Sequence, residues 1–310
     1  MQCLQSVWKV RSGKRSVMRI LILGGSGMLG HRLWVELSKG YTTWMTLRSS
    51  ASVMPDLPGV DRHYICEHVE ATNLDEVTRV FAAIQPDVVI NCIGLIKQLP
   101  LSNDPLSSLK INALLPHQLA LIASAAKMRM LHFSTDCVFS GKKVGAYTEE
   151  DQSDAEDLYG RSKFLGEISY LPQTLTLRTS IIGRELSTSY GLLEWFLSQR
   201  QKIQGYRRAI FSGFTTGALA RIVRDEVLPN PQLTGLYHLS SEPISKYHLL
   251  GLCNEAYTCG IEIVPDDDMV CNRALDSSRF RATTGCEIPT WRAMIDEMRS
   301  DNIPYDAWRK

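Results

Sequence analysis

Two residues with complementary chemistry, Tyr159 and Lys163, lie four positions apart in the segment YGRSK. Four residues make about one helical turn, so a phenol and an ammonium would project from the same helix face. A free tyrosine titrates near pH ~10 and is a poor acid at neutrality. A neighbouring cation favours the phenolate, which predicts that Lys163 lowers the pKa of Tyr159. Alone, the two residues could equally be an exposed helix pair, so their role depends on what faces them.

A glycine-rich turn far upstream predicts what faces the phenol. The segment Gly24–Gly30 (GGSGMLG) follows a predicted strand and opens a predicted helix, as a phosphate-binding turn requires. Glycines there permit a tight turn and a close approach of pyrophosphate, while the helix N-terminus faces the phosphates. A purely structural turn is the alternative. The dinucleotide contacts predicted from this segment are Gly24, Ser26, Gly27, Met28, Leu29 and Gly30.

The end of the second predicted strand indicates which dinucleotide binds. NAD-binding chains usually place an acidic residue there to hold the ribose 2′-hydroxyl. This region reads TLRSS, without a carboxylate, and Arg48 could pair with a 2′-phosphate. NADP(H) is therefore favoured, while NAD(H) stays open because Arg48 could also be a solvated surface side chain. We place Glu70 near the adenine.

A third residue, Thr135, ends a predicted strand and precedes Tyr159 by 24 positions. Its hydroxyl could bind the same substrate oxygen as the phenol, although a strand-end cap is the alternative. The predicted reaction is hydride delivery from a nicotinamide to a carbonyl carbon. In it, Tyr159 donates the proton, Thr135 positions the carbonyl, and Lys163 also binds the nicotinamide ribose.

The elements that must position these residues alternate between strand-length apolar runs and amphipathic helices, which predicts βαβ units and a parallel sheet. The expected class is α/β, a Rossmann doubly wound parallel sheet with a smaller C-terminal substrate-binding lobe. Expected strands are Arg19–Leu23, Thr43–Leu47, Arg62–Cys66, Asp87–Cys92, Met130–Ser134, Thr174–Arg178 and Gly235–Ser240. Expected helices are Met28–Leu37, Leu74–Ile84, Asn112–Lys127, the helix of Tyr159, Leu192–Gln199, Thr216–Leu228, Tyr247–Tyr257 and Trp291–Arg299.

The domain organisation follows from the same pattern. Residues 1–17 are basic and lack an apolar signal core, which predicts a disordered tail. Residues 18–183 are the predicted NAD(P)-binding Rossmann domain. Residues 184–310 are expected to form mainly the substrate-binding lobe, with the strand near 235–240 returning to the sheet.

The amino-acid composition is typical of a globular protein rather than of a nucleic-acid-binding or membrane-spanning one. Hydrophobic residues make up 44% and charged residues 22% of the 310 residues, as in ordinary globular proteins. A net charge of +1 lacks the broad basic signature of a nucleic-acid binder, and no apolar run reaches the ~18 residues that span a bilayer. The eight cysteines form no CxxC pair, so we predict reduced thiols, no metal site and a cytoplasmic location. A homodimer is the default expectation.

The motifs together resemble the extended short-chain dehydrogenase/reductase superfamily and are most similar to its dTDP-4-dehydrorhamnose reductase-like (RmlD-like) group. The resemblance is strong over residues 18–183. It implies a Rossmann domain, NADP(H) with contacts from Cys92, Ile93 and Gly94, and reduction of a C4 keto group on a nucleotide-linked deoxysugar for surface polysaccharide. It is carried by Gly24–Gly30, Asn91–Gly94, Ile111–Ala113, Ser134–Gly141, Tyr159–Lys163, Gly166-Glu167 and Arg178-Thr179.

One residue that departs from the family pattern, Cys137, bears on whether the reaction is a reduction or an elimination. Cys137 stands where the reductase group usually carries an aromatic residue and where the resembling sugar-nucleotide 4,6-dehydratases carry a catalytic glutamate. A neutral thiol replaces a carboxylate acid/base poorly. Reduction is therefore favoured over elimination, while the identity of the sugar stays open.

Several further residues are predicted to contact the substrate. Asp136 and Cys137 adjoin Thr135, and Lys97 lies in the loop after Gly94, although a surface lysine is equally expected. Arg178 and Arg207 are candidate clamps for a pyrophosphate, although each alone is more often a surface charge. A second set is interpreted as structural: His238 and His248 as satisfied histidines, and Trp195 and Phe196 as core or dimer contacts rather than sugar-stacking residues.

Two other functions remain open from the sequence. A nucleotide-sugar epimerase would recycle a tightly held cofactor, usually NAD, and Arg48 counts mildly against it. A non-catalytic subunit would bind NADP and dock to an enzyme. The complete set of Thr135, Tyr159 and Lys163 makes that function less favoured, although a fold by itself does not determine function.

Overall fold

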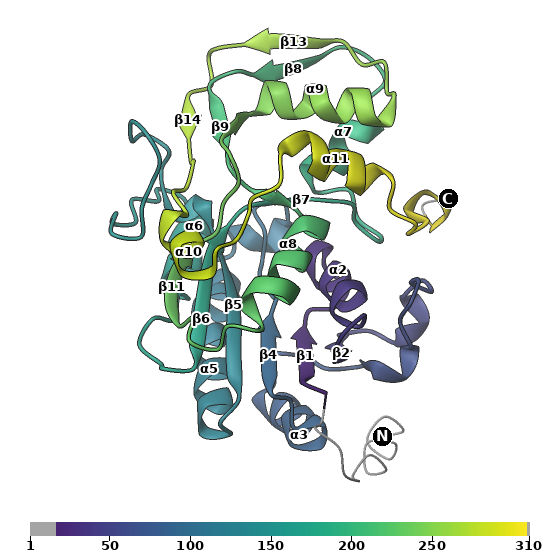
Figure 1. Cartoon of the computed structure of the whole chain (residues 1–310), viewed down its shortest axis with the longest axis vertical. Helices are drawn as coiled ribbons and strands as arrows, with labels where there is room; N and C mark the ends of the chain where they lie inside the picture. The colour runs from purple at the N-terminus through teal and green to yellow at the C-terminus, as the bar shows by residue number, and fades with distance from the viewer. Residues whose placement is uncertain (1–16, 309–310) are drawn as a thin grey trace.

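A seven-stranded sheet forms the centre of the computed structural model, which describes residues 17–308 (Figure 1). Its order is β11-β6-β5-β4-β1-β2-β3, and every neighbouring pair is parallel. The predicted doubly wound α/β class is confirmed, with the order reversing between β1 and β4. The strands are β1 (Arg19–Leu23), β2 (Thr42–Thr46), β3 (Ile65–Cys66), β4 (Val88–Asn91), β5 (Arg129–Thr135), β6 (Thr174–Thr179) and β11 (Gly235–His238).

Both faces of this sheet are buried, which is why β1 and β4 read as nearly continuous apolar runs. Successive side chains of β1 divide between the two faces: Ile20 and Ile22 join one core cluster, and Leu21 and Leu23 the other. The first cluster includes the apolar sides of α2 (Met28–Leu37) and α8 (Thr216–Ile222). The second includes those of α3 (Leu74–Ile84) and α5 (Leu115–Ala125).

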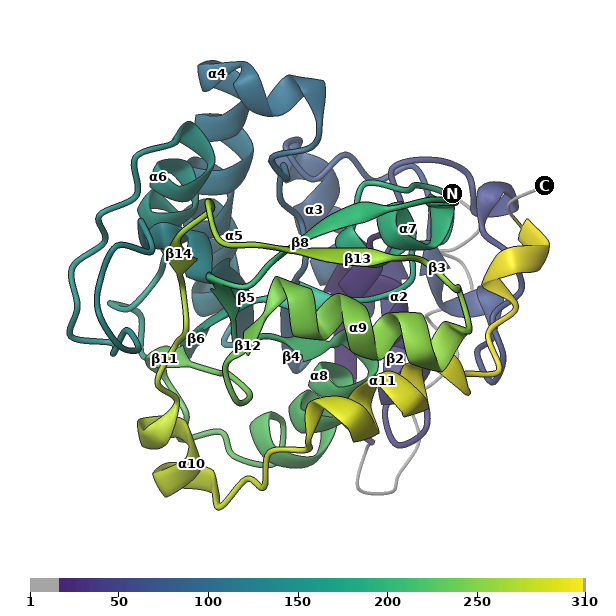
Figure 2. The ribbon, with the colours of Figure 1, turned by 90° about the horizontal axis from the view of Figure 1, so that it is seen from above.

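The other described elements form short sheets and helices, most of them above the carboxyl ends of the central strands (Figures 1 and 2). β8 pairs with β13, β9 pairs with both β12 and β14, and β7 pairs with β10. The strands are β7 (Ile181–Ile182), β8 (Ile203–Tyr206), β9 (Ala209–Phe211), β10 (Phe214–Thr215), β12 (Ile244–Ser245), β13 (Ile263–Asp266) and β14 (Cys271–Asn272). The helices are α4 (Pro105–Ser108), α6 (Leu158–Leu165), α7 (Leu192–Ser198), α9 (Lys246–Tyr257), α10 (Ser278–Thr284) and α11 (Trp291–Arg299).

The structure differs from the sequence predictions in three places. The strand expected at Arg62–Cys66 is mostly a 3₁₀ turn, with only Ile65 and Cys66 in β3. The helix expected from Asn112 begins at Pro105, capped by the Asp104 side chain, and runs through a π-helical segment into α5. Exposed leucines such as Leu106 blur its amphipathic pattern. The strands β7–β10 and β12–β14 were largely missed because two to four residues are too few to show a period.

The predicted N-terminal tail lies outside the described residues, apart from Val17. Across residues 17–308, no helix combines the length and apolarity needed to cross a membrane.

Candidate active site

A cavity of about 880 Å³ lies at the carboxyl ends of β1, β2, β4, β5 and β6. Its other wall comes from the short elements above the sheet, including residues of β8, β9, β14 and α9. The position is the one at which open doubly wound sheets bind ligands, beside the reversal of strand order. Thr135, Tyr159 and Lys163 all line it.

The glycine turn after β1 forms one end of the cavity, with Ser26, Gly27, Met28 and Leu29 lining it. Gly24 has a φ of +84°, in the left-handed region that glycine adopts readily. A Cβ at Gly30 would lie 2.1 Å from the Gly24 carbonyl oxygen, so only glycine allows this approach of helix to turn. Gly24 and Gly30 therefore shape the turn from behind the lining residues.

A histidine that the sequence did not single out anchors this turn. His31 is fully buried, its Nδ1 is 2.8 Å from the Gly27 carbonyl oxygen, and its Nε2 is 2.8 Å from the hydroxyl of Tyr305. Burial lowers the pKa of His31 to about 3, so the ring is neutral at physiological pH. Tyr305 is 274 residues away along the chain, and no local pattern predicts such a contact.

Helix α6 brings Tyr159 to Thr135 because Gly160 allows a close approach. A Cβ at Gly160 would lie 2.2 Å from the Cys137 carbonyl oxygen. The carboxylate of Asp157 caps the helix by accepting a hydrogen bond from the Gly160 N–H at 2.7 Å. The hydroxyl of Thr135 donates a hydrogen bond to the Asp136 carboxylate at 3.2 Å, accepts one from the Cys137 N–H at 3.1 Å, and lies near enough to the Tyr159 phenol to influence its pKa. Phenol and hydroxyl are thus held together at the cavity wall.

The expectation that Lys163 lowers the pKa of Tyr159 is wrong for this structure. Burial is the largest influence and raises the pKa of Tyr159 above its usual value, and the Thr135 hydroxyl opposes it only in part. The Lys163 ammonium instead donates to the Phe133 carbonyl oxygen at 2.7 Å. Tyr159 is therefore a neutral phenol, the form that can donate a proton.

Lys163 is buried at the floor of the cavity. Burial lowers the pKa of Lys163 to about 8, and the Glu167 carboxylate opposes this shift. A Cβ at Gly94 would lie 3.9 Å from its Nζ atom, so the loop after β4 passes directly beside the ammonium. Cys92, Ile93 and Gly94 of that loop line the cavity, as does Arg48 after β2.

These features fit a dinucleotide. The glycine turn leaves a cradle that side chains would fill, and the first N–H groups of α2 have no partners within the helix itself. Arg48 lines the same cavity and supplies an exposed cation beyond the turn. Glu70 does not line the cavity, and its carboxylate accepts hydrogen bonds from Thr72. Its placement beside an adenine therefore has no support from the structure.

The predicted substrate residues divide into two groups. Lys97, Asp136 and Cys137 line the cavity, with Lys97 Nζ 2.5 Å from Asp157 and 5.5 Å from the centre of the Tyr159 ring. Burial raises the pKa of Cys137 to about 12, which keeps it a neutral thiol. The predictions for Arg178 and Arg207 need correction, because neither lines the cavity.

Both of these arginines are engaged elsewhere. Arg178 is 3% exposed and makes a two-point contact with the carboxylate of Glu167, at 2.8 and 2.7 Å. Its third contact, at 3.2 Å, is to Nε2 of His238, whose Nδ1 lies 3.1 Å from the Tyr147 carbonyl oxygen. His238 is thus the satisfied structural histidine that was expected. Arg207 pairs with Asp267 on the surface.

Trp195, Lys246 and Arg273 are among the wall residues that sequence reasoning did not assign to the site. Trp195 lines the cavity and is 41% exposed, so a core contact is excluded and the dimer contact stays a prediction, whereas Phe196 is fully buried in the core. Lys246 and Arg273 also line the cavity. They come from elements without a recognisable motif, and only the fold of the short sheets brings them to Thr135.

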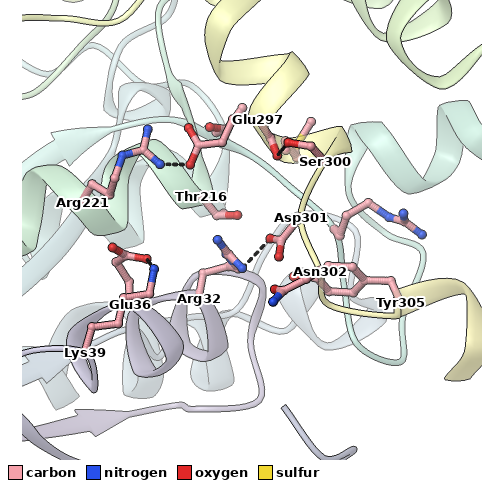
Figure 3. Close-up of a pocket in the computed structure, with 14 residues that line it drawn as sticks. Arg32, Glu36, Lys39, Thr216, Arg221, Glu297, Ser300, Asp301, Asn302 and Tyr305 are labelled. Atoms are coloured by element: carbon pink, nitrogen blue, oxygen red, sulfur yellow. Dashed lines mark hydrogen bonds and ion pairs between the residues drawn. The ribbon is translucent and has the colours of Figure 1, made fainter. Parts of the chain in front are cut away.

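A second cavity of about 390 Å³ lies between α2, α8 and the chain after α11 (Figure 3). Its charged side chains are paired: Arg32 with Asp301 at 2.5 Å, Lys39 with Glu36 at 2.6 Å, and Arg221 with Glu297. The pairs Arg32–Asp301 and Arg221–Glu297 tie the C-terminal segment to the helices that cover the sheet. Among residues 17–308, no cluster of three potential metal ligands occurs in either cavity or elsewhere.

The chain is similar to several known proteins. Residues 18–302 match the family model described as the RmlD substrate binding domain. The dTDP-4-dehydrorhamnose reductase of Aggregatibacter actinomycetemcomitans is 24% identical over 255 residues, covering 75% of this chain and 87% of that protein.

Two solved structures show the same fold. One is the dTDP-4-dehydrorhamnose reductase of Bacillus anthracis str. Ames in complex with NADP, with a TM-score of 0.75, 20% identity, and coverage of 91% of this chain and 98% of that one. The other is the Bordetella bronchiseptica enzyme WbmG in complex with NAD, with a TM-score of 0.72, 21% identity, and coverage of 93% and 95%.

Proposed function

Because the chain belongs to the RmlD substrate binding domain family, we propose that it reduces a keto group, at C4, on a nucleotide-linked deoxysugar with NADPH. The observation that carries the proposal is that Thr135, Tyr159 and Lys163 line one cavity together with the glycine turn and Arg48. The names of relatives add support: dTDP-4-dehydrorhamnose reductases, and a spore coat polysaccharide biosynthesis protein of Bacillus subtilis. Surface polysaccharide is accordingly the proposed destination of the product.

The roles of the residues follow from their contacts. Bound NADPH would supply a hydride to the carbonyl carbon. Tyr159 gives its phenolic proton to the carbonyl oxygen, so the ketone becomes an alcohol. Thr135, whose hydroxyl lies near that phenol, holds the same oxygen in place. The Lys163 ammonium, which lies beside Gly94, binds the nicotinamide ribose.

NADPH is the proposed reductant because of Arg48. Its guanidinium can bind a 2′-phosphate in a two-point contact, while the TLRSS segment around it lacks a carboxylate for a free ribose hydroxyl. The complex of the Bacillus anthracis relative with NADP supports the same choice. Because WbmG was solved in complex with NAD, NADH is assayed beside NADPH in the test.

The decisive experiment follows nicotinamide absorbance with NADPH or NADH and a dTDP-4-keto-6-deoxysugar. We expect stoichiometric NADPH oxidation, and a fall of about 10²–10⁴-fold in kcat for Tyr159→Phe, which removes the proton donor without changing shape. Arg161→Lys, on the exposed side of the same helix, is the control. An unchanged rate in Tyr159→Phe would overturn the assigned mechanism.

The same assay separates the other functions. An epimerase would interconvert the sugars without net loss of NADPH and would purify with bound NAD(H). A non-catalytic subunit would bind NADP and turn over no keto sugar. Either result would reject the reductase.

We also propose a cytoplasmic location and a homodimer. The seven cysteines among the described residues are all free thiols, which suits a reducing compartment. Fractionation of the native host and analytical ultracentrifugation of the full chain test the two statements separately.

A further inference from the structure

Lys246 is a cation without a fixed partner in the candidate active site. It begins α9 and lines the cavity. Among residues 17–308, no hydrogen bond or ion pair engages its ammonium, whose recorded contact is with the Phe211 ring, 4.0 Å from Nζ to the ring centre. An ammonium has three donors, and leaving them unsatisfied in a partly desolvated place is costly. The Lys246 ammonium can therefore donate hydrogen bonds to an acceptor that residues 17–308 do not provide.

Arg273 is a second such cation on the same wall. Its Nε donates to the Phe139 carbonyl oxygen at 2.7 Å, and its Nη1 lies 3.8 Å from the Cys137 sulfur. Within the described range it has no carboxylate within ion-pair distance, in contrast to Arg178, Arg184 and Arg207. These two contacts hold the guanidinium in place and leave further N–H donors for a ligand.

The local charge balance is positive. Lys246 and Arg273 both interact electrostatically with the Asp136 carboxylate and the two thiols Cys137 and Cys271. Burial raises the pKa of Cys137 to about 12, so that thiol is neutral, and Asp136 can compensate only one of the two cations. The Asp157 carboxylate also interacts with Arg273, but it is paired with Lys97 at 2.5 Å. One positive charge remains on the cavity wall that Thr135 also lines.

We propose that Lys246 and Arg273 form a subsite for an acidic group of the substrate, holding it next to the reacting carbonyl. Phosphate and carboxylate oxygens share the required chemistry, because both accept charge-assisted hydrogen bonds from an ammonium and a guanidinium. The two sources are the diphosphate of a nucleotide sugar and a carboxylate on the sugar ring. The subsite rests on the proposed function only in treating the cavity as a sugar-nucleotide site.

A purely electrostatic role, in which Lys246 does no more than balance Asp136, makes a different prediction. In that case Lys246→Met would leave the preference for acidic ligands unchanged, because Arg273 still compensates the Asp136 carboxylate. If Lys246 serves a ligand, Lys246→Met removes an unsatisfied charge, the melting temperature stays the same or rises, and ligand binding falls.

The test measures binding to the full chain by calorimetry with NADP⁺ present, so it needs no turnover. Thymidine against dTDP isolates the diphosphate, and UDP-glucose against UDP-glucuronate isolates the carboxylate. In Lys246→Met and Arg273→Gln, we expect the preference for the acidic member of one pair to fall at least about tenfold. Lys246→Arg should retain most of it. Lys202→Met, an exposed lysine paired with Glu262, should retain all of it.

The pair that loses its preference identifies the source of the acidic group. The proposal is overturned if the wild-type protein prefers neither acidic member, or if both variants keep the wild-type preferences. Failure of the proposed function would look different. A protein that binds dTDP or UDP-glucuronate through Lys246 but oxidises no NADPH with any keto sugar would keep the subsite and lose the reductase.

Discussion

Replacing Arg178 should unfold the protein more readily rather than weaken substrate binding. Its side chain is 3% exposed and that of its partner Glu167 is 8% exposed. Two guanidinium–carboxylate contacts and a third to His238 hold the group. In Arg178→Met, the Glu167 carboxylate would remain buried with only the Ser134 hydroxyl, at 2.6 Å, among its recorded hydrogen-bond donors.

Removing one partner of a buried pair typically costs about 3–5 kcal/mol, because the other charge is left uncompensated. Against a total stability of about 5–15 kcal/mol, this is a large fraction. With a urea dependence of about 3 kcal/mol per molar, the unfolding midpoint should fall by about 1–2 M. The double variant Arg178→Met with Glu167→Leu removes both charges and should recover much of the loss.

Urea unfolding followed by far-ultraviolet circular dichroism measures these shifts. Arg207→Met is the matched control, because the pair of Arg207 with Asp267 is exposed and should leave the midpoint unchanged. A substrate clamp at Arg178 would behave in the opposite way. A variant with wild-type stability and a strongly raised KM for the sugar nucleotide would refute the structural role assigned here.

Three further perturbations test the cofactor and catalytic ends of the cavity. Burial lowers the pKa of Lys163 to about 8, so its ammonium is lost as pH rises through that value, and kcat/KM should fall above pH 8. The variant Lys163→Arg stays charged, so the fall in kcat/KM should move to higher pH. Arg48→Ala should raise KM for NADPH by about tenfold or more while changing KM for NADH little, and equal effects on both would contradict a 2′-phosphate contact. Gly30→Ala places a Cβ 2.1 Å from the Gly24 carbonyl oxygen and should weaken NADPH binding and cost about 1–3 kcal/mol of stability; Gly40→Ala, with no atom within 4 Å of the added Cβ, should do neither.

The amino-acid sequence alone predicted the features that depend on neighbours in the chain. The glycine turn, the helix opening at Met28 and the one-turn spacing of Tyr159 and Lys163 follow from local backbone geometry. Central strands such as β1 and β4 were readable because both faces of the sheet are buried and each of the two is almost one apolar run. Short half-exposed strands such as β8 and β14 lack that signal.

The tertiary structure alone decided which charges meet the cavity. Arg178 and Arg207 looked like phosphate ligands, but Glu167 and Asp267 engage them, and those partners are 11 and 60 residues away. Lys246 and Arg273 carried no motif, yet they reach the wall beside Thr135. The physical reason is that a charge acts through what lies within a few ångströms of it, and packing of distant segments sets those neighbours. The same holds for the pKa of Tyr159, which burial controls more strongly than the lysine one turn away.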